Sequence, residues 1–237
     1  MIIPDIIISW PRNCDYPLWR QYIRDNRTRF NEVIIIFTET HFGEDYRDFV
    51  THAMQPDHVL TVWDYQRDGR EDWRNQAIHA GLIHSYNAQW ILFTEQDFLP
   101  KIGFWQNVQA DEGMGVRAIG VKDNERLHPC CLFLRRDLLN SLSKDFGVVK
   151  DKLDHFGLIQ KQLESSNEPI GILNPDTYFH NNGLSHNMSL VERGEMPNYH
   201  PTEFTQYLVD SLNCTVPKDK RWLDMFGSYL GKVNVQE

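Results

Sequence analysis

Four short and almost continuously apolar runs in the first hundred residues constrain the fold more than any other feature. They span residues 2–9, 33–38, 59–63 and 90–94 and are rich in isoleucine and valine. Strands that are apolar on both sides are typical of a parallel sheet that is covered on both faces. Segments with helical character separate the runs, at 16–30, 44–54 and 73–85. This alternation predicts an α/β domain with right-handed crossovers, a mostly parallel sheet and helices on both faces.

The pattern becomes less regular after residue 97. Strands are predicted at 116–121, 131–135 and 170–173, and helices at 137–142 and 154–163. The tail from 201 to 230 mixes aromatic and charged residues and predicts two short helices packed on the body. We therefore expect one main domain over residues 1–195 and a short helical C-terminal extension over residues 196–237.

Charge and cysteine usage narrow the classes of function. A net charge of −9 disfavours broad electrostatic binding of nucleic acid or anionic membrane, although a local basic groove stays open. No apolar run approaches the ~20 residues of a membrane helix. The first ten residues carry Pro4 and Asp5 and lack a basic leader, and the four cysteines form no CxxC pair. These features predict a cytoplasmic protein without a membrane span.

Polar side chains follow the predicted strands at the points where the strands end. The first strand ends at Ser9, the second runs into Glu39, the third into Asp64, and the fourth into Glu95 and Asp97. In an open parallel sheet, ligands bind at the carboxyl ends of the strands. One acid there is ordinary because aspartate also caps helices, but acids at three of four strand ends predict a shared polar site.

The pair Glu95-x-Asp97 is the sharpest of these signals. Two carboxylates at the exit of a buried strand offer hard oxygen ligands, which suit Mn²⁺ or Mg²⁺ held jointly with substrate phosphates. A strand-end turn with solvated acids is the alternative, because an acid-x-acid pattern is short.

This order of parts resembles the GT-A fold glycosyltransferases, especially the large family 2. The shared parts are an acid closing the second strand, an acid closing the third, the pair Arg74-Asn75 opening the next helix, and an acid-x-Asp closing the fourth. The resemblance covers residues 2–99 and extends more loosely beyond them. It implies a GT-A-like (Rossmann-like) catalytic domain that binds a nucleotide-sugar across the strand ends.

The resemblance also implies roles for individual residues. Glu39 and Arg74 would contact the nucleoside, and Glu95 would support the ribose or a water molecule on the metal. Asp97 would ligate Mn²⁺ or Mg²⁺. Ser9 and Asp64 would line the same nucleotide-sugar site, although Asp64 also fits a helix N-cap. The sequence departs from the commoner Asp-x-Asp at Glu95, which leaves the role of that residue open.

A second resemblance lies at residues 180–185, His-Asn-Asn-Gly-Leu-Ser. It is similar to a His-x-x-Gly-x-Ser stretch late in family 2, in which the histidine completes the metal and pyrophosphate site. His180 would then be a metal ligand, and Gly183 would allow the backbone to approach a phosphate. His186 competes for the same role, and a single histidine also occurs as a structural residue.

Inverting transfer needs a general base for the acceptor hydroxyl. Asp151 and Asp154 precede a predicted helix, and Asp154 is the preferred candidate because it stands next to that helix. An N-cap aspartate has the same sequence signature, and His155 interrupts the paired acids of the family pattern.

Two other motifs are set aside. Residues 113–118 match GxGxxA in letters, but they precede a predicted strand and do not follow one, so a pyrophosphate would meet no helix N-terminus there. The stretch from His128 to Cys131 could suggest a thiol site, but the apolar residues after it indicate the start of a buried strand.

These features predict a glycosyltransferase that moves a sugar from a nucleotide-diphosphate sugar to an acceptor hydroxyl. The acceptor could be a glycan, a lipid, a protein or a modified nucleic acid. One alternative is a metal-dependent hydrolase or phosphotransferase using Asp97, His180 and His186. Another is a catalytically degenerate nucleotide-binding protein, for which Glu95 and His155 would be signs of decay.

Overall fold

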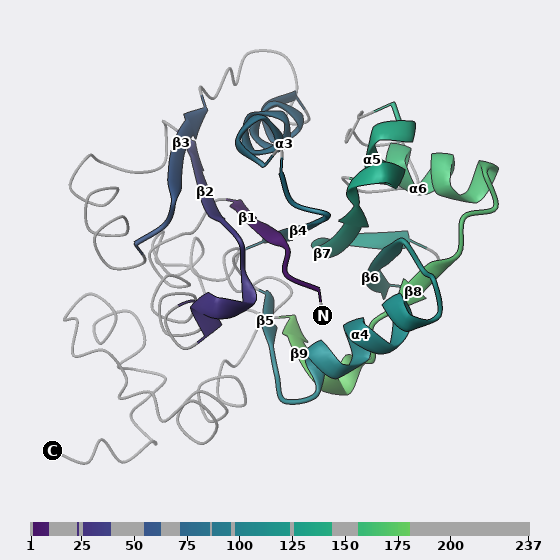
Figure 1. The fold of residues 1–237 in the computed structure, drawn as a ribbon. Coiled ribbons are helices and arrows are strands. Elements are labelled where there is room, and N and C mark those ends of the chain that lie inside the picture. Colours follow the sequence, from purple (N-terminus) through teal and green to yellow (C-terminus); the bar gives the residue numbers. More distant parts are fainter. Residues whose placement is uncertain are drawn as a thin grey trace, which may run out of the picture.

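The computed structural model describes residues 2–9, 23, 26–38, 55–62, 72–85, 87–95, 98–123, 126–143 and 156–180 (Figure 1). The strands are β1 Asp5–Ser9, β2 Val33–Thr38, β3 His58–Val62, β4 Trp90–Glu95, β5 Phe98–Pro100, β6 Ala118–Asp123, β7 Arg126–Arg135, β8 Ile170–Ile172 and β9 Tyr178–His180. The helices are η1 Arg27–Arg29, α3 Asp72–His84, α4 Phe104–Gly113, α5 Arg136–Ser141, α6 Gly157–Ser165 and η2 Pro175–Thr177. The predicted helix at 44–54 and the predicted extension at 196–237 lie outside the described residues, and the predicted helix at 16–30 lies largely outside them.

Seven strands form one sheet in the order β3-β2-β1-β4-β7-β6-β8. The four strands predicted in the first hundred residues pair in parallel, β3 with β2, β2 with β1 and β1 with β4. β6 pairs in parallel with β8, and β7 runs antiparallel to both of its neighbours, β4 and β6. The predicted α/β fold with a mostly parallel sheet is therefore confirmed.

The two faces of the sheet are covered by different helices. Helices α3, α5 and α6 pack on one face, where Ile7, Phe93 and Leu132 join a buried apolar cluster (Figure 1). Helix α4 covers the opposite face, where the rings of Phe104 and Trp105 pack on Phe133 with centroid separations of 5.9 Å. Because neighbouring residues of a strand point to opposite faces, continuous apolar runs such as 90–94 supply both layers.

Gly81 lets α3 lie close to the sheet. A Cβ atom at this position would stand 2.9 Å from Ile7 Cγ2 and 3.0 Å from Ile36 Cδ1. Real Cβ atoms do not approach other heavy atoms so closely, so a larger residue would push the helix away from β1 and β2.

A buried carboxylate joins the start of β1 to three other segments. The Asp5 side chain is 1% exposed and accepts hydrogen bonds from Asn31 Nδ2 at 2.8 Å, from the Glu32 backbone N–H at 3.1 Å and from Ser85 Oγ at 2.7 Å. Arg136 donates to the same Ser85 hydroxyl at 3.0 Å. Burial lowers the pKa of the Arg136 guanidinium, and the nearby Asp5 charge raises it in part. This network anchors α3 and α5 to the edge of the sheet opposite the strand ends.

A second buried acid lies in the last turn of α4. Asp111 is 8% exposed, and its Oδ2 has no hydrogen-bond partner among the residues that the structure describes. A Cβ atom on Gly171 of β8 would stand 2.6 Å from that oxygen, so the glycine makes room for the carboxyl group. Burial raises the pKa of Asp111 above its ordinary value of 3.8.

We expect Asp111→Asn to stabilise the protein at neutral pH. A raised pKa means that the folded protein binds this proton more tightly than the unfolded chain. The free energy of unfolding therefore falls as the pH rises from about 3.8 through the raised value, and the loss is complete above it. The charge also opposes the helix dipole. The variant should gain about 1 kcal/mol in urea unfolding at pH 7, and the gain should shrink toward pH 4.

Glu112→Gln is the matched control for Asp111→Asn, because it removes a less buried charge from the same helical turn. It should leave the free energy of unfolding within about 0.5 kcal/mol of wild type. A gain for Asp111→Asn that is equal at pH 7 and pH 4 would contradict the burial argument.

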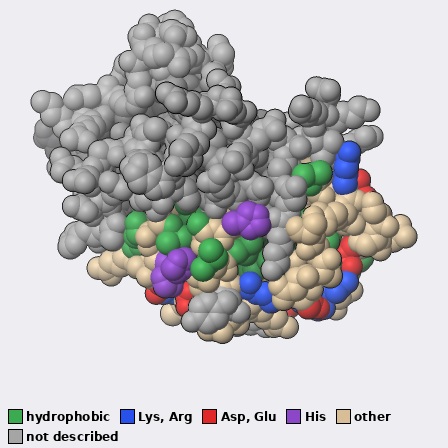
Figure 2. All heavy atoms as spheres, turned by 90° about the horizontal axis from the view of Figure 1, so that it is seen from above, with side chains coloured by type: hydrophobic (Ala, Val, Ile, Leu, Met, Phe, Trp, Pro, Cys, Tyr) green, Lys and Arg blue, Asp and Glu red, His purple; other side chains and the backbone are tan. Residues whose placement is uncertain are grey.

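The described surface carries charges of both signs. On the face drawn in Figure 2, lysine and arginine side chains are interspersed with acidic ones, and the described residues there form no continuous basic area. Among the helices that the structure describes, none has the length and apolar character needed to cross a membrane.

Candidate active site at the carboxyl ends of the strands

The register of the sheet brings two of the predicted site residues together. Ser9, the last residue of β1, is the Cα partner of Glu95, the last residue of β4. On the other side, Thr38 of β2 pairs with Val62 of β3. The next residue after Thr38 is Glu39, and Asp64 follows Val62 by two positions, but both acids lie outside the described residues. The strand ends of β1 to β4 therefore share one edge, as predicted.

Arg74 belongs to the first turn of α3, which starts at Asp72, one residue before the predicted start at 73. This turn follows β3 in the chain, and α3 packs against β1, β2 and β3. The side chain of Arg74 is outside the described part of the structure.

His180 lies in a small second sheet next to the acid-x-Asp motif. Its strand, β9, pairs antiparallel with β5, and His180 is the Cα partner of Phe98. The ring of Phe98 holds this sheet in place by packing on Tyr178 at 5.1 Å and on Phe104 at 5.7 Å between centroids. The residue before Phe98 is Asp97, which lies outside the described residues. The fold thus brings His180, which stands 82 positions after Phe98 in the sequence, to the strand that directly follows the motif.

Two residues that sequence reasoning had set aside stand beside His180. The rings of His128 and His180 have centroids 4.2 Å apart at an angle of 60°. One potential ligand atom from each of His128, Cys130 and His180 lies within 4.8 Å of the other two. His128 is 7% exposed and Cys130 is fully buried. The predicted strand start at 128–131 is confirmed, but its donor groups were missed, and the only sequence signal for them was the His-x-Cys spacing.

An irregularity in β7 places these donors. The register between β6 and β7 shifts between Gly120 and Lys122, so that β7 contains three more residues than β6 between the Gly120–Leu132 and Lys122–Leu127 pairs. Pro129 lies in this interval and lacks the N–H that a central strand needs, so a bulge accommodates it. Thr94 Oγ1 donates to the Cys130 carbonyl at 3.0 Å, which ties the end of β4 to the same point.

Asp154, the predicted general base, lies outside the described residues. The helix after it, α6, begins at Gly157, and Phe156 occupies its N-cap with φ +68° and without a side-chain cap. The general base and helix-cap roles of Asp154 both stay predictions, and the N-cap position that the structure describes is Phe156.

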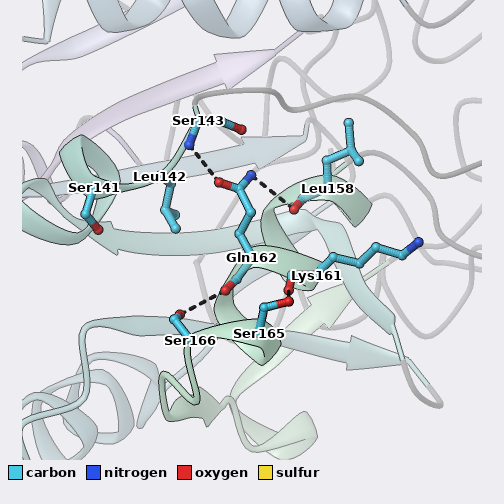
Figure 3. Close-up of a pocket in the computed structure, with 8 residues that line it drawn as sticks. All are labelled: Ser141, Leu142, Ser143, Leu158, Lys161, Gln162, Ser165 and Ser166. Atoms are coloured by element: carbon cyan, nitrogen blue, oxygen red, sulfur yellow. Dashed lines mark hydrogen bonds between the residues drawn. The ribbon is translucent and has the colours of Figure 1, made fainter.

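A groove of about 670 Å³ between α5 and α6 does not belong to this edge (Figure 3). Gln162 uses its amide within the groove, accepting from the Ser143 backbone N–H at 2.7 Å and donating to the Leu158 carbonyl at 3.2 Å. Helix α5 follows Arg135, which pairs with Trp90 at the start of β4. The groove thus lies toward the opposite end of β4. We interpret it as the packing boundary between α5 and α6.

Comparison with known proteins identifies the fold. No protein-family model and no curated protein matches the sequence. A crystal structure from Desulfovibrio desulfuricans, of a protein assigned as a nucleotide-diphospho-sugar transferase, is similar with a TM-score of 0.50 and 12% identity over 98% of each chain. Glucosyl-3-phosphoglycerate synthase from Mycobacterium tuberculosis, in complex with phosphoglyceric acid, is similar with a TM-score of 0.52 and 13% identity over 84% of this chain and 82% of that one. The resemblance to GT-A fold proteins is confirmed at the level of the fold.

Proposed function

We propose that this protein is a metal-dependent glycosyltransferase that moves a sugar from a nucleotide-diphosphate sugar to an acceptor hydroxyl. One observation carries the proposal. The strand that bears Glu95 ends beside Ser9, and the strand that directly follows the acid-x-Asp motif is paired at its first residue with His180. The names of the similar structures, a nucleotide-diphospho-sugar transferase and a glucosyl-3-phosphoglycerate synthase, support the same chemistry.

The donor would lie across the carboxyl ends of β1 to β4. Glu39 and Arg74 would hold the nucleoside, and Glu95 would hold the ribose hydroxyls or a metal-bound water. Ser9 and Asp64 would complete the wall of this site. Placement at strand ends and at the start of α3 suits these roles, because the loops and the helix N-terminus there present polar groups to a ligand.

Asp97 and His180 would hold Mn²⁺ or Mg²⁺, which supplies positive charge against the departing nucleoside diphosphate. An imidazole suits this position because it can act as a neutral ligand beside carboxylates. Asp154 would accept the proton of the attacking hydroxyl as a general base. The acceptor remains a glycan, a lipid, a protein or a modified nucleic acid, because acceptor specificity lies in loops.

A thermal-shift panel of nucleoside diphosphates, with and without Mn²⁺, tests the donor site. Ligand at a hundred times its Kd stabilises a folded protein by about 2.7 kcal/mol, which corresponds to roughly 5–10 °C for a chain of this length. We expect one base to give this shift only in the presence of Mn²⁺. Asp97→Ala should lose the shift, whereas Asp176→Ala, which removes an exposed acid near β9, should keep it.

The pattern of shifts separates the alternatives. A shift without Mn²⁺, or one that survives Asp97→Ala, would contradict the metal-bridged donor site. Selective binding without turnover of any matching nucleotide-sugar would favour a degenerate binding protein. No shift with any nucleotide would favour a metal-dependent hydrolase or phosphotransferase.

A further inference from the structure

We propose that His128, Cys130 and His180 form a binding site for a borderline divalent transition metal, Zn²⁺ or a close chemical relative. Two imidazole nitrogens and one thiolate sulfur would hold the ion at the carboxyl edge of the sheet. The site goes beyond the proposed transfer reaction, because neither His128 nor Cys130 belongs to the acid-x-Asp motif or to the donor site predicted from the sequence. Only His180 is common to both.

The distances fit a site that closes around an ion. The three donor atoms lie within 4.8 Å of one another. In a tetrahedral site with Zn–S of about 2.3 Å and Zn–N of about 2.0–2.1 Å, ligand atoms stand roughly 3.3–3.6 Å apart. Side-chain movements on the order of 1 Å would therefore bring the donors into contact with one ion. The centroids of the two imidazole rings are already 4.2 Å apart.

The donor chemistry selects the class of metal. Thiolate and imidazole ligands favour Zn²⁺ and its neighbours, whereas Mg²⁺ prefers carboxylate, carbonyl and water oxygens. Three protein ligands are also the number found in zinc sites that keep a fourth position for water or substrate. Thr94, whose hydroxyl donates to the Cys130 carbonyl, is the residue before Glu95. Cys130 therefore lies at the end of β4, which is the edge at which the proposed donor would bind.

The backbone is arranged to present these donors. A regular central strand would need a backbone N–H at position 129, which Pro129 lacks. The register shift that accommodates Pro129 changes the direction of the side chains on either side of it. The Cys130 backbone N–H donates to Nδ1 of His128 at 3.2 Å. This contact holds the His128 ring beside Cys130, and because a metal needs the lone pair of the nitrogen that it binds, an ion at Nδ1 would replace this hydrogen bond. Apolar side chains would fill this buried space at a lower desolvation free energy than two imidazoles, so the histidines indicate a role beyond packing.

Cobalt titration of the protein tests the site. The protein is treated with a chelator, kept reduced with a phosphine and titrated with Co²⁺, which substitutes for Zn²⁺ and gives a sulfur-to-metal charge-transfer band when a thiolate binds it. We expect a saturable band at one Co²⁺ per chain that Zn²⁺ abolishes in competition. Absence of the band from the wild-type protein would overturn the proposal, without any variant having to fold.

Two cysteine variants assign the band. Cys131 is also fully buried and is the next residue in β7, so Cys131→Ser is the matched control. We expect Cys130→Ser to abolish the band and Cys131→Ser to keep it. His128→Ala should weaken Co²⁺ binding by more than about 100-fold, since loss of even an outer partner costs 10–100-fold. A band that persists in Cys130→Ser would overturn the assignment.

The result is independent of the transfer reaction. Asp97→Ala should lose the nucleotide-dependent thermal shift but keep the cobalt band. A protein with the band and without nucleotide binding would retain the metal site and refute the transferase. Nucleotide binding without the cobalt band would support the transferase and refute the metal site at His128, Cys130 and His180.

Discussion

Asp97→Ala will reduce the rate of sugar transfer by at least about 10³-fold. A metal at the departing nucleotide contributes several kcal/mol of transition-state stabilisation, and each 1.36 kcal/mol is a factor of ten. The rate is measured with the nucleotide-sugar whose base gives the thermal shift, as release of nucleoside diphosphate in the presence of Mn²⁺. We choose Asp97 because it lies in the sequence between Glu95 and Phe98, and both of these residues lie at the predicted edge.

The control for Asp97→Ala must remove a charge from the same region without touching the donor site. Asp176 is an exposed acid in η2, two residues before β9, and Asp176→Ala should transfer sugar within about twofold of wild type. An Asp97→Ala variant with full metal-dependent turnover would show that the motif does not hold the metal.

His180 is the residue on which the two proposed sites depend together. It is the cross-strand partner of Phe98, next to the acid-x-Asp motif, and its ring packs on His128. A hard oxygen site and a nitrogen-sulfur site that share one imidazole cannot be far apart. The two proposed sites are therefore neighbours that share one ligand, and the cobalt band and the nucleotide-dependent thermal shift report on them separately.

The parallel half of the sheet was predictable from the sequence because its signal is local. Runs such as 33–38 and 90–94 are apolar at every position except a final threonine, which is the pattern of a strand that is buried on both faces. The site residues at the ends of these strands follow from the same reasoning. Ser9 and Glu95 meet because parallel strands that start at one edge end at the other.

Three elements were missed because their stability is not local. Helix α4 buries Phe104, Trp105 and Val108 but also Asp111, so its apolar pattern is weak. Strands β5 and β9 have three residues each and are stabilised by pairing with each other. The paired residues Phe98 and His180 are 82 positions apart in the sequence. For His128 to Cys131 the sequence predicts only the start of a buried strand, because no sequence pattern reports how a bulge orients two side chains.

Asp5→Ala will lower the free energy of unfolding by about 3–5 kcal/mol. The substitution leaves three donors without their acceptor, Asn31, Glu32 and Ser85, and it removes the negative charge that faces Arg136. The buried Ser85 hydroxyl costs about 1–3 kcal/mol when it is left unsatisfied, and the two part-buried hydrogen bonds from Asn31 and Glu32 contribute about 1 kcal/mol each. Urea unfolding at pH 7 measures the difference, and a domain stable by 5–15 kcal/mol will lose a large share of its stability.

Asp57→Ala is the matched control, because Asp57 also accepts from a backbone N–H, that of Val33, and from a side chain, Arg27. The difference is exposure: the side chains of Asp57 and Arg27 are 35% and 39% exposed, so water replaces the lost contacts. The control should therefore lose only about 1 kcal/mol. Asp5→Asn, which keeps one acceptor oxygen, should fall between the two and remains measurable if Asp5→Ala does not fold. Equal losses for Asp5→Ala and Asp57→Ala would mean that burial does not set the strength of this network, and that the sheet edge opposite the strand ends is held by apolar packing alone.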